Sequence, residues 1–184
     1  MEQQHQTKKG RHPLTQRNCQ GFPPSIDDDC RVLILGSMPS VASLAANEYY
    51  AHPQNRFWPL MAQLLENTTA PAVYQERLAL LLRHHIGLWD AIASCDRDGS
   101  LDSAIRNEQG NDFQSLLESH ASIHFIGCNG AKAFQCFRRF NKALMRRPDI
   151  EVQALPSTSP ANAKWRLEDL AREWGAALRE HLDF

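Results

Sequence analysis

The chain of 184 residues lacks any apolar run that approaches the roughly 18 residues a membrane-spanning helix needs. Polar residues also occupy its N-terminus, where a signal peptide would be apolar. An excess of charge is absent too, because 20 Lys and Arg against 21 Asp and Glu leave a net charge of -1. This balance excludes a histone-like polycation and an acidic solvating tail. We therefore expect a protein without membrane segments that works in the cytoplasm, in a bacterial-type cytosol or nucleoid.

Cysteines are few and scattered. The five cysteines lie at positions 19, 30, 95, 128 and 136, and no two of them form a C-x-x-C pair. This spacing indicates neither a disulfide framework nor a closed zinc or iron–sulfur site, and it fits a reducing compartment. No other cluster of metal ligands is visible, so we expect no metal ion and no other cofactor.

Apolar residues make up 42% of the chain, which suffices for the core of one compact domain. Residues 1–27 are polar, contain three prolines and show no apolar period. We therefore expect a loose N-terminal arm over residues 1–27, followed by a single domain over residues 28–184 that works as a monomer.

Short apolar runs alternate with segments of helical period along this domain. The runs predict strands at residues 31–36, 86–92, 123–127 and 152–155. The period predicts helices from residue 57, after Pro71, after a cap at Asn111, around Phe134 and Phe137, and from Trp165 to the C-terminus. This order predicts an α/β fold, a three-layer α/β/α sandwich on a short, mostly parallel four-stranded sheet. Ligands are expected at the carboxyl ends of the strands.

A long loop, Gly36–Trp58, joins the first strand to the first helix, and loops of about twenty residues inside a compact domain are usually functional. It ends in Ala51-His-Pro-Gln-Asn-Arg-Phe-Trp58, and the last strand leads into Leu155-Pro-Ser-Thr-Ser-Pro-Ala-Asn162. The loop Gly36–Trp58 and the run Leu155–Asn162 resemble the first and second motifs of the uracil-DNA glycosylase superfamily, in particular of its hypoxanthine-DNA (deoxyinosine) glycosylase family. The resemblance extends over residues 28–182 and implies a uracil-DNA glycosylase-like catalytic domain that acts on double-stranded DNA containing a deaminated base.

Two departures from the superfamily pattern separate this chain from the uracil-specific members. Met38 stands where most members place a water-activating Asn or Asp, and Ser157 stands where uracil-specific members carry a His. Both departures match the hypoxanthine family, in which the resemblance implies that Asn55 takes the main catalytic role. An Asn just before a helix is also a favoured N-cap, so capping remains an alternative for Asn55.

Other candidate residues would hold the flipped base. Tyr50 matches the position that stacks on the base in related enzymes, although a loop Tyr can also pack on the edge of the sheet. Asp90 matches the position that reads the edge of the base, and a helix N-cap or an Arg partner is its alternative role. Asp90 would accept the N–H of hypoxanthine, while a backbone N–H near Gly36 or Ser37 would meet its carbonyl.

Candidate contacts to the DNA backbone lie in the second motif and in a basic segment. Ser157, Ser159 and Asn162 belong to a short loop that precedes a helix, where phosphate donors are common. Lys132 begins the segment 132–147, which contains six cations and no acidic residue. Such a run either contacts DNA or forms a solvated face.

The resulting hypothesis is a monofunctional DNA glycosylase of base-excision repair that flips deoxyinosine out of DNA and hydrolyses its N-glycosidic bond. One alternative is a glycosylase with the same reaction but a different base, a uracil-DNA glycosylase or a mismatch-specific uracil-DNA glycosylase. The other is a catalytically silent module that binds damaged bases.

Overall fold

Four short parallel strands form the central sheet in the computed structural model, which describes residues 16–184. Their order across the sheet is β3 (Ile86–Asp90), β2 (Val32–Gly36), β6 (Phe125–Asn129) and β7 (Glu151–Leu155). Every neighbouring pair is parallel, so the predicted short, parallel, four-stranded sheet is confirmed. All five residues of β2 are buried, as a strand covered on both faces requires.

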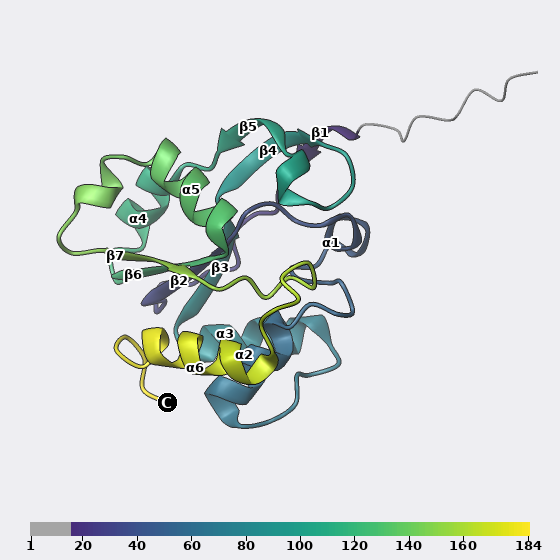
Figure 1. Cartoon of the computed structure of the whole chain (residues 1–184). Coiled ribbons are helices and arrows are strands. Elements are labelled where there is room, and N and C mark those ends of the chain that lie inside the picture. The colour runs from purple at the N-terminus through teal and green to yellow at the C-terminus, as the bar shows by residue number, and fades with distance from the viewer. Residues whose placement is uncertain (1–15) are drawn as a thin grey trace, which may run out of the picture.

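Helices cover both faces of this sheet (Figure 1). One face carries α2 (Phe57–Glu66), α3 (Tyr74–Arg83) and α6 (Leu167–Leu178), and the other carries α4 (Phe113–Ser119) and α5 (Ala131–Phe140). Alternate side chains of β2 serve two separate cores: Val32 and Ile34 pack with α2 and α6, whereas Leu33 and Leu35 pack with α4 and α5. The three-layer α/β/α sandwich is therefore confirmed.

A second, antiparallel sheet was not expected. It consists of β1 (Gln16–Gln20), β4 (Ile92–Arg97) and β5 (Arg106–Gly110), in the order β1-β4-β5. The single strand predicted over residues 86–92 is wrong, because β3 ends at Asp90 and Ile92 begins β4 in the other sheet. At this junction, the backbone N–H groups of Ala91 and Ile92 donate to the carbonyls of Gly36 and Ser37.

The loose arm predicted over residues 1–27 is wrong for residues 16–27, and residues 1–15 lie outside the described part. Beyond the pairing of β1 with β4, Gly21 N donates to Ala93 O at 2.7 Å. The backbone of Ser25 forms a bridge with Leu88. This segment therefore continues the second sheet and then runs along β3. The polar composition of the segment concealed this role, because its order comes from backbone pairing.

Several boundaries differ slightly from the prediction. The cap of α4 is Asp112, whose carboxylate accepts from Ser115 N, and not Asn111, whose side chain donates to Asp90 O. The third predicted strand starts at Phe125, two residues late, and Trp165 precedes α6. The remaining elements are short: α1 (Val41–Ala46), η1 (Asp102–Ala104) and η2 (Leu144–Arg146).

All five cysteines are buried, and Cys30, Cys95, Cys128 and Cys136 are free thiols. Within residues 16–184, no helix is both long and apolar enough to cross a membrane.

Candidate active site

A cleft of about 690 Å³ opens beyond the carboxyl ends of the parallel strands. In Figure 1 this is the side on which α1 and the loop after β7 lie. The cleft is lined by all of the predicted site residues except Lys132: Gly36, Ser37, Met38, Tyr50, Asn55, Asp90, Ser157, Ser159 and Asn162. The two motifs, about a hundred residues apart in the chain, therefore meet in one site, as expected at the strand ends of an open α/β sheet.

Asn55 is held by hydrogen bonds at one end of its amide. Its Oδ1 accepts from the backbone N–H of Phe57 at 3.0 Å and from the hydroxyl of Thr158 at 2.9 Å. An amide oxygen has two lone pairs, so these two bonds use its accepting capacity. The amide nitrogen is the remaining polar end of Asn55, and Asn55 lines the cleft. The capping and cleft-lining roles of Asn55 are thus compatible, and the side chain offers donors to a ligand.

Thr158 connects Asn55 to Asn129, the last residue of β6. Its hydroxyl accepts from Asn129 Nδ2, and its backbone N–H donates to Asn129 Oδ1, each at 2.9 Å. Thr158 is completely buried and Asn129 is 8% exposed. Neither residue was among the predicted site residues. Two features of the sequence could have pointed to them: Thr158 lies inside the second motif, and Asn129 lies just after the carboxyl end of a predicted strand, where ligands are expected.

Tyr50 occupies a strained backbone conformation beside the cleft. Its φ of 55° lies in the left-handed region, which is unfavourable for a bulky residue and is found most often at functional sites. One face of its ring stacks on Phe57, with centroids 3.9 Å apart and planes 24° apart. Its hydroxyl oxygen is buried without a hydrogen-bond partner. Burial raises the pKa of this phenol above its ordinary value, with a smaller contribution from Asp90.

Asp90 places a buried carboxyl group at the cleft. The residue is 3% exposed, and its Oδ2 has no hydrogen-bond partner. Desolvation raises the pKa of Asp90 to about 7, while Arg97 opposes the shift and Asp102 adds to it. The alternative role of Asp90 as a cap of the next helix is wrong, because Asp112 caps α4.

Gly36 makes room for this carboxyl group. A Cβ atom at position 36 would lie 2.4 Å from Asp90 Oδ1 and 3.3 Å from the Tyr50 hydroxyl. Only a glycine therefore lets the carboxyl group and the phenol converge on the end of β2. This convergence of two partnerless polar atoms at a cleft is typical of a ligand site.

Met38 and Ser37 complete the floor formed by the first motif. Met38 is 7% exposed and packs in the core between β2 and α5, while it also lines the cleft. A thioether can neither deprotonate nor orient water as a carboxylate or amide does. Ser37 donates its hydroxyl proton to Asp102 Oδ1 at 2.6 Å, so its side chain ties the first motif to the segment between β4 and β5.

Arg56 joins the two motifs directly, and the sequence analysis assigned it no role. Its guanidinium donates to four backbone carbonyls of the loop after β7, those of Thr158, Ser159, Asn162 and Trp165. Arg56 N also donates to Thr158 O at 3.1 Å. The rigid fork of donors in a guanidinium suits this task, because one side chain can satisfy several carbonyls that point inward.

The loop after β7 is further held by bonds among its own residues. Ser157 Oγ accepts from Ser159 N, Ser159 Oγ accepts from Ala161 N, and Asn162 Nδ2 donates to Ser157 O. The two hydroxyl groups therefore act as acceptors within the loop, and their protons remain available to donate. At the facing turn, Gly130 has a φ of 96° and would bring a Cβ to 3.0 Å from Ser157 Cβ.

Lys132 lies outside the cleft, in a separate groove on α5. Its amino group pairs with Glu108 of β5 at 2.9 Å, and Arg139 pairs with the same carboxylate at 3.1 Å. Partial burial raises the pKa of Glu108, but the hydrogen bond from Lys132 and the two cations outweigh it and lower the pKa to about 2. The basic segment is thus partly neutralised by a neighbour in space. Lys164, which the sequence analysis missed, is the exposed cation that lines the cleft.

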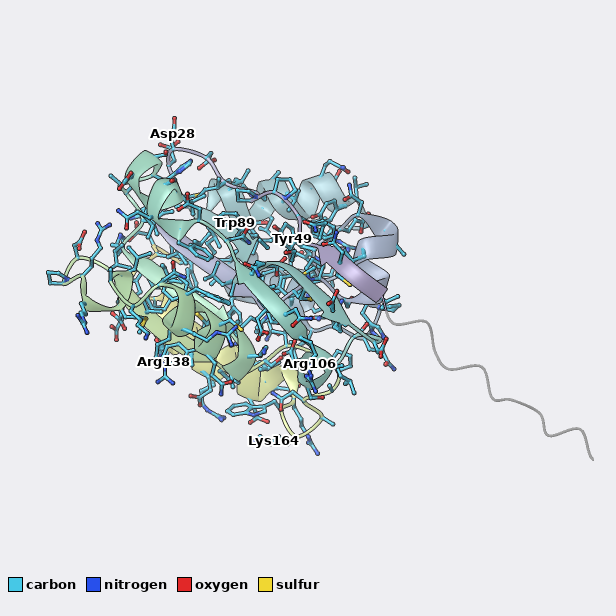
Figure 2. The ribbon with its side chains drawn as sticks, turned by 90° about the horizontal axis from the view of Figure 1, so that it is seen from above. Asp28, Tyr49, Trp89, Arg106, Arg138 and Lys164 are labelled. Atoms are coloured by element: carbon cyan, nitrogen blue, oxygen red, sulfur yellow. The ribbon has the colours of Figure 1, made fainter. Side chains whose placement is uncertain are left out.

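In Figure 2, Lys164 lies at the lower edge of the molecule and Asp28 at the opposite, upper edge. Within the described part of the chain, no three His, Cys, Asp or Glu side chains group together as a metal site requires.

Comparisons with known proteins identify the family to which this chain belongs. The family model described as the uracil DNA glycosylase superfamily matches residues 23–179. A protein of Methanosarcina acetivorans named hypoxanthine DNA glycosylase is 36% identical over 159 residues, which cover 86% of this chain and 97% of that protein. Its namesake from Methanosarcina barkeri is 34% identical over 160 residues, which cover 87% of this chain and 98% of that protein.

A solved structure is similar as well. The solution NMR structure of a protein from Methanosarcina acetivorans, provisionally named a uracil DNA glycosylase, superimposes with a TM-score of 0.75 at 35% sequence identity. The match covers 89% of this chain and 98% of the other.

Proposed function

The chain belongs to the uracil-DNA glycosylase superfamily, and from this premise we propose that it is a DNA glycosylase that removes hypoxanthine from DNA. The two relatives named hypoxanthine DNA glycosylase support the substrate, because they match nearly their whole length. The absence of an Asn or Asp at Met38 and of a His at Ser157 supports hypoxanthine over uracil.

One observation carries the proposed mechanism: the oxygen of Asn55 already accepts two hydrogen bonds. Asn55 is therefore suited to donate to the departing base, and not to accept a proton from water. Cleavage breaks the bond between the sugar carbon and the base nitrogen, and the electron pair leaves with the base. A donor placed at the base stabilises this developing charge, in the manner of an oxyanion hole.

The attacking water adds its oxygen to the sugar carbon after the sugar has become cationic, and the proton that it loses passes through solvent to the departed base, which is released neutral. Because Met38 offers no base at this step, the rate depends mainly on how well the base is stabilised as a leaving group. We expect a modest chemical rate for that reason. Lys164, the lysine among the residues that line the cleft, is exposed in the loop after β7 and is assigned to the DNA backbone, so we propose a monofunctional glycosylase without strand cleavage.

Asp90 is proposed to read the edge of the base. Hypoxanthine presents an N–H donor beside a carbonyl acceptor, and a neutral carboxyl group presents the complementary acceptor and donor. A pKa of about 7 allows the neutral form near physiological pH, and a base that covers the cleft excludes water and favours it further. Tyr50 is proposed to stack on the base with the ring face that does not contact Phe57.

We propose that the target nucleotide is flipped out of duplex DNA by a monomer. Flipping costs a few kcal/mol and is cheapest for a mispaired base. The Ser157 and Ser159 hydroxyls, Asn162 and the exposed Lys164 are proposed to contact the DNA backbone. Lys132 is not included, because its charge is committed to Glu108. The free thiols of Cys30, Cys95, Cys128 and Cys136 support the cytoplasm as the compartment.

The test is single-turnover excision from duplexes that contain one deoxyinosine, deoxyuridine or deoxyxanthosine, scored as alkali-labile sites. We expect excision at deoxyinosine without an added metal ion. Preferential excision of uracil would overturn the substrate, and binding without turnover would indicate a silent reader of damaged bases.

Asn55→Ala and Asn55→Asp separate catalysis from capping. The aspartate keeps both acceptor contacts, to Phe57 and Thr158, but loses the amide donors. We expect both variants to lose at least about 100-fold in excision rate, as removal of one such donor does elsewhere. Circular dichroism should show that Asn55→Asp is folded. A near-parental excision rate in Asn55→Asp would mean that Asn55 only caps the helix and takes no part in catalysis.

A further inference from the structure

Leu101 is an exposed leucine at the rim of the cleft. With 60% of its surface exposed, it exceeds the other exposed large hydrophobic residues among residues 18–184, which are Val41, Val73 and Phe140. It also lines the cleft, which those three residues do not. An apolar side chain in that position is covered by nothing in the described chain.

The segment that carries Leu101 is anchored to the first motif on both sides. Ser100 Oγ accepts from Val41 N at 2.9 Å, and Asp102 Oδ1 accepts from Ser37 Oγ at 2.6 Å. The carbonyl of Leu101 accepts from Ala104 N at 3.0 Å and closes the turn of η1. The backbone is therefore held in place on both sides of the exposed Leu101 side chain.

At the rim that the loop after β7 forms, Ala161 and Asn162 are poorly suited to enter a base stack. Ala161 offers a single methyl group, and Asn162 Nδ2 donates to Ser157 O within its own loop. That rim presents hydroxyl groups and the Lys164 ammonium, which suit phosphates. The loop after β7 thus supplies polar groups to the cleft, and the segment between β4 and β5 adds one exposed aliphatic side chain.

A duplex from which a nucleotide has been flipped has a gap in its base stack, and apolar side chains inserted at such steps stabilise the distorted duplex. We propose that Leu101, in the segment between β4 and β5, enters the duplex beside the flipped nucleotide and keeps that nucleotide in the cleft. This inference rests on the proposed function. It makes Leu101 a positioning residue that acts on the DNA and leaves the reacting atoms to Asn55 and Asp90.

The test compares excision of hypoxanthine from duplex and from single-stranded DNA, because only a duplex must be held open. We expect Leu101→Ala to slow single-turnover excision from the duplex at least tenfold and to change the single-strand rate less than twofold. Leu101→Met, which retains length and apolar character, should restore most of the duplex rate. Val73→Ala is the matched control, since Val73 is 50% exposed at the start of α3, away from the cleft.

The role of Leu101 can also be tested without turnover, by measuring whether the bound protein opens the base stack. A 2-aminopurine beside the deoxyinosine brightens when the stack opens, and we expect this signal with the parent and a reduced signal with Leu101→Ala. Equal losses on duplex and single strand, or an unchanged duplex rate with an unchanged signal, would overturn the role of Leu101. A parent that brightens 2-aminopurine but releases no hypoxanthine would overturn the proposed function, while the variant would still decide the role of Leu101.

Discussion

At the scale of single residues, the polar atoms of the site differ in whether they already have a hydrogen-bond partner within the protein. The oxygen of Asn55 is fully used, whereas Asp90 Oδ2 and the Tyr50 hydroxyl are buried without partners. Buried polar atoms of this kind cost free energy unless a ligand or water satisfies them. A base with a donor and an acceptor on one edge would satisfy Asp90.

The state of Asp90 leads to a pH prediction. If the neutral carboxyl group reads the base, excision should fall as pH rises through about 7, the pKa to which burial raises Asp90. Asp90→Asn keeps a donor and an acceptor in one plane but does not titrate. We therefore expect this variant to remain active and to lose the decline above pH 7. Single-turnover rates between pH 5.5 and 9 measure both effects.

The control for this profile is Asp149→Asn, because Asp149 is an exposed partner of Arg147 outside the cleft. Its variant should keep the parental profile. A parental rate that instead rises through pH 7 would mean that the ionised carboxylate is the competent form and that backbone donors meet the carbonyl of the base.

At the scale of elements, the catalytic geometry depends on two loops that are tied together after they leave the sheet. Arg56, at the start of α2, satisfies four carbonyls in the loop after β7. Asn129, at the end of β6, holds Thr158 in the same loop. The strands bring the loops near each other, and these side chains set their relative position.

Arg56→Lys should loosen this connection. A single ammonium cannot reach the positions of a guanidinium fork, so carbonyls are left without donors, at a cost of about 2 kcal/mol. We expect the thermal midpoint to fall by roughly 4–8 °C, since 1 kcal/mol corresponds to about 2–4 °C at this size. Amide exchange in residues 157–165 should accelerate, and excision should slow.

Arg77→Lys is the matched control, because Arg77 also donates to backbone carbonyls, those of Pro71 and Ala72, but lies outside the cleft. Its variant should leave exchange in residues 157–165 and the excision rate unchanged. If Arg56→Lys behaves like Arg77→Lys, the loop is held by its own internal bonds.

At the scale of the whole molecule, the second sheet supports one wall of the cleft. β4 leads directly into the segment that carries Leu101, and β1 pairs with β4 on its outer side. The chain after β1 is also attached to the main sheet, because Trp89 Nε1 donates to Phe22 O at 3.0 Å. Residues 16–25 thus connect the two sheets behind the site.

Removing this connection should destabilise the protein. A chain that begins at residue 25 loses the β1 pairing, the burial of Cys19 and the bond from Trp89, whereas one that begins at residue 16 keeps every described contact. We expect the shorter chain to lose about 2 kcal/mol or more, a fall of roughly 4–8 °C in thermal midpoint relative to the longer one. Equal midpoints from calorimetry would mean that this segment adds nothing to stability.

The sequence by itself determined the central sheet, the helices that cover it and the family. Continuous apolar runs such as Val32–Leu35 can only be buried on both faces, and the helical period marks the faces that cover them. The residues of the two motifs also identified much of the lining of the cleft, but residues 100–103, Asn129 and Lys164, which line it too, lie outside them. These features are local, so a short stretch of sequence is enough to encode them.

Only the tertiary structure decided which groups meet. β1 and β5 are polar, and their order comes from backbone pairing with β4, which leaves no period in the side chains. The partner of Lys132 is 24 residues away in sequence, and the partner that orients Asn55 is 103 residues away. The exposure of Leu101 and the raised pKa of Asp90 likewise depend on what surrounds them. Hydrogen bonding and desolvation act through space, so these properties exist only once the chain has folded.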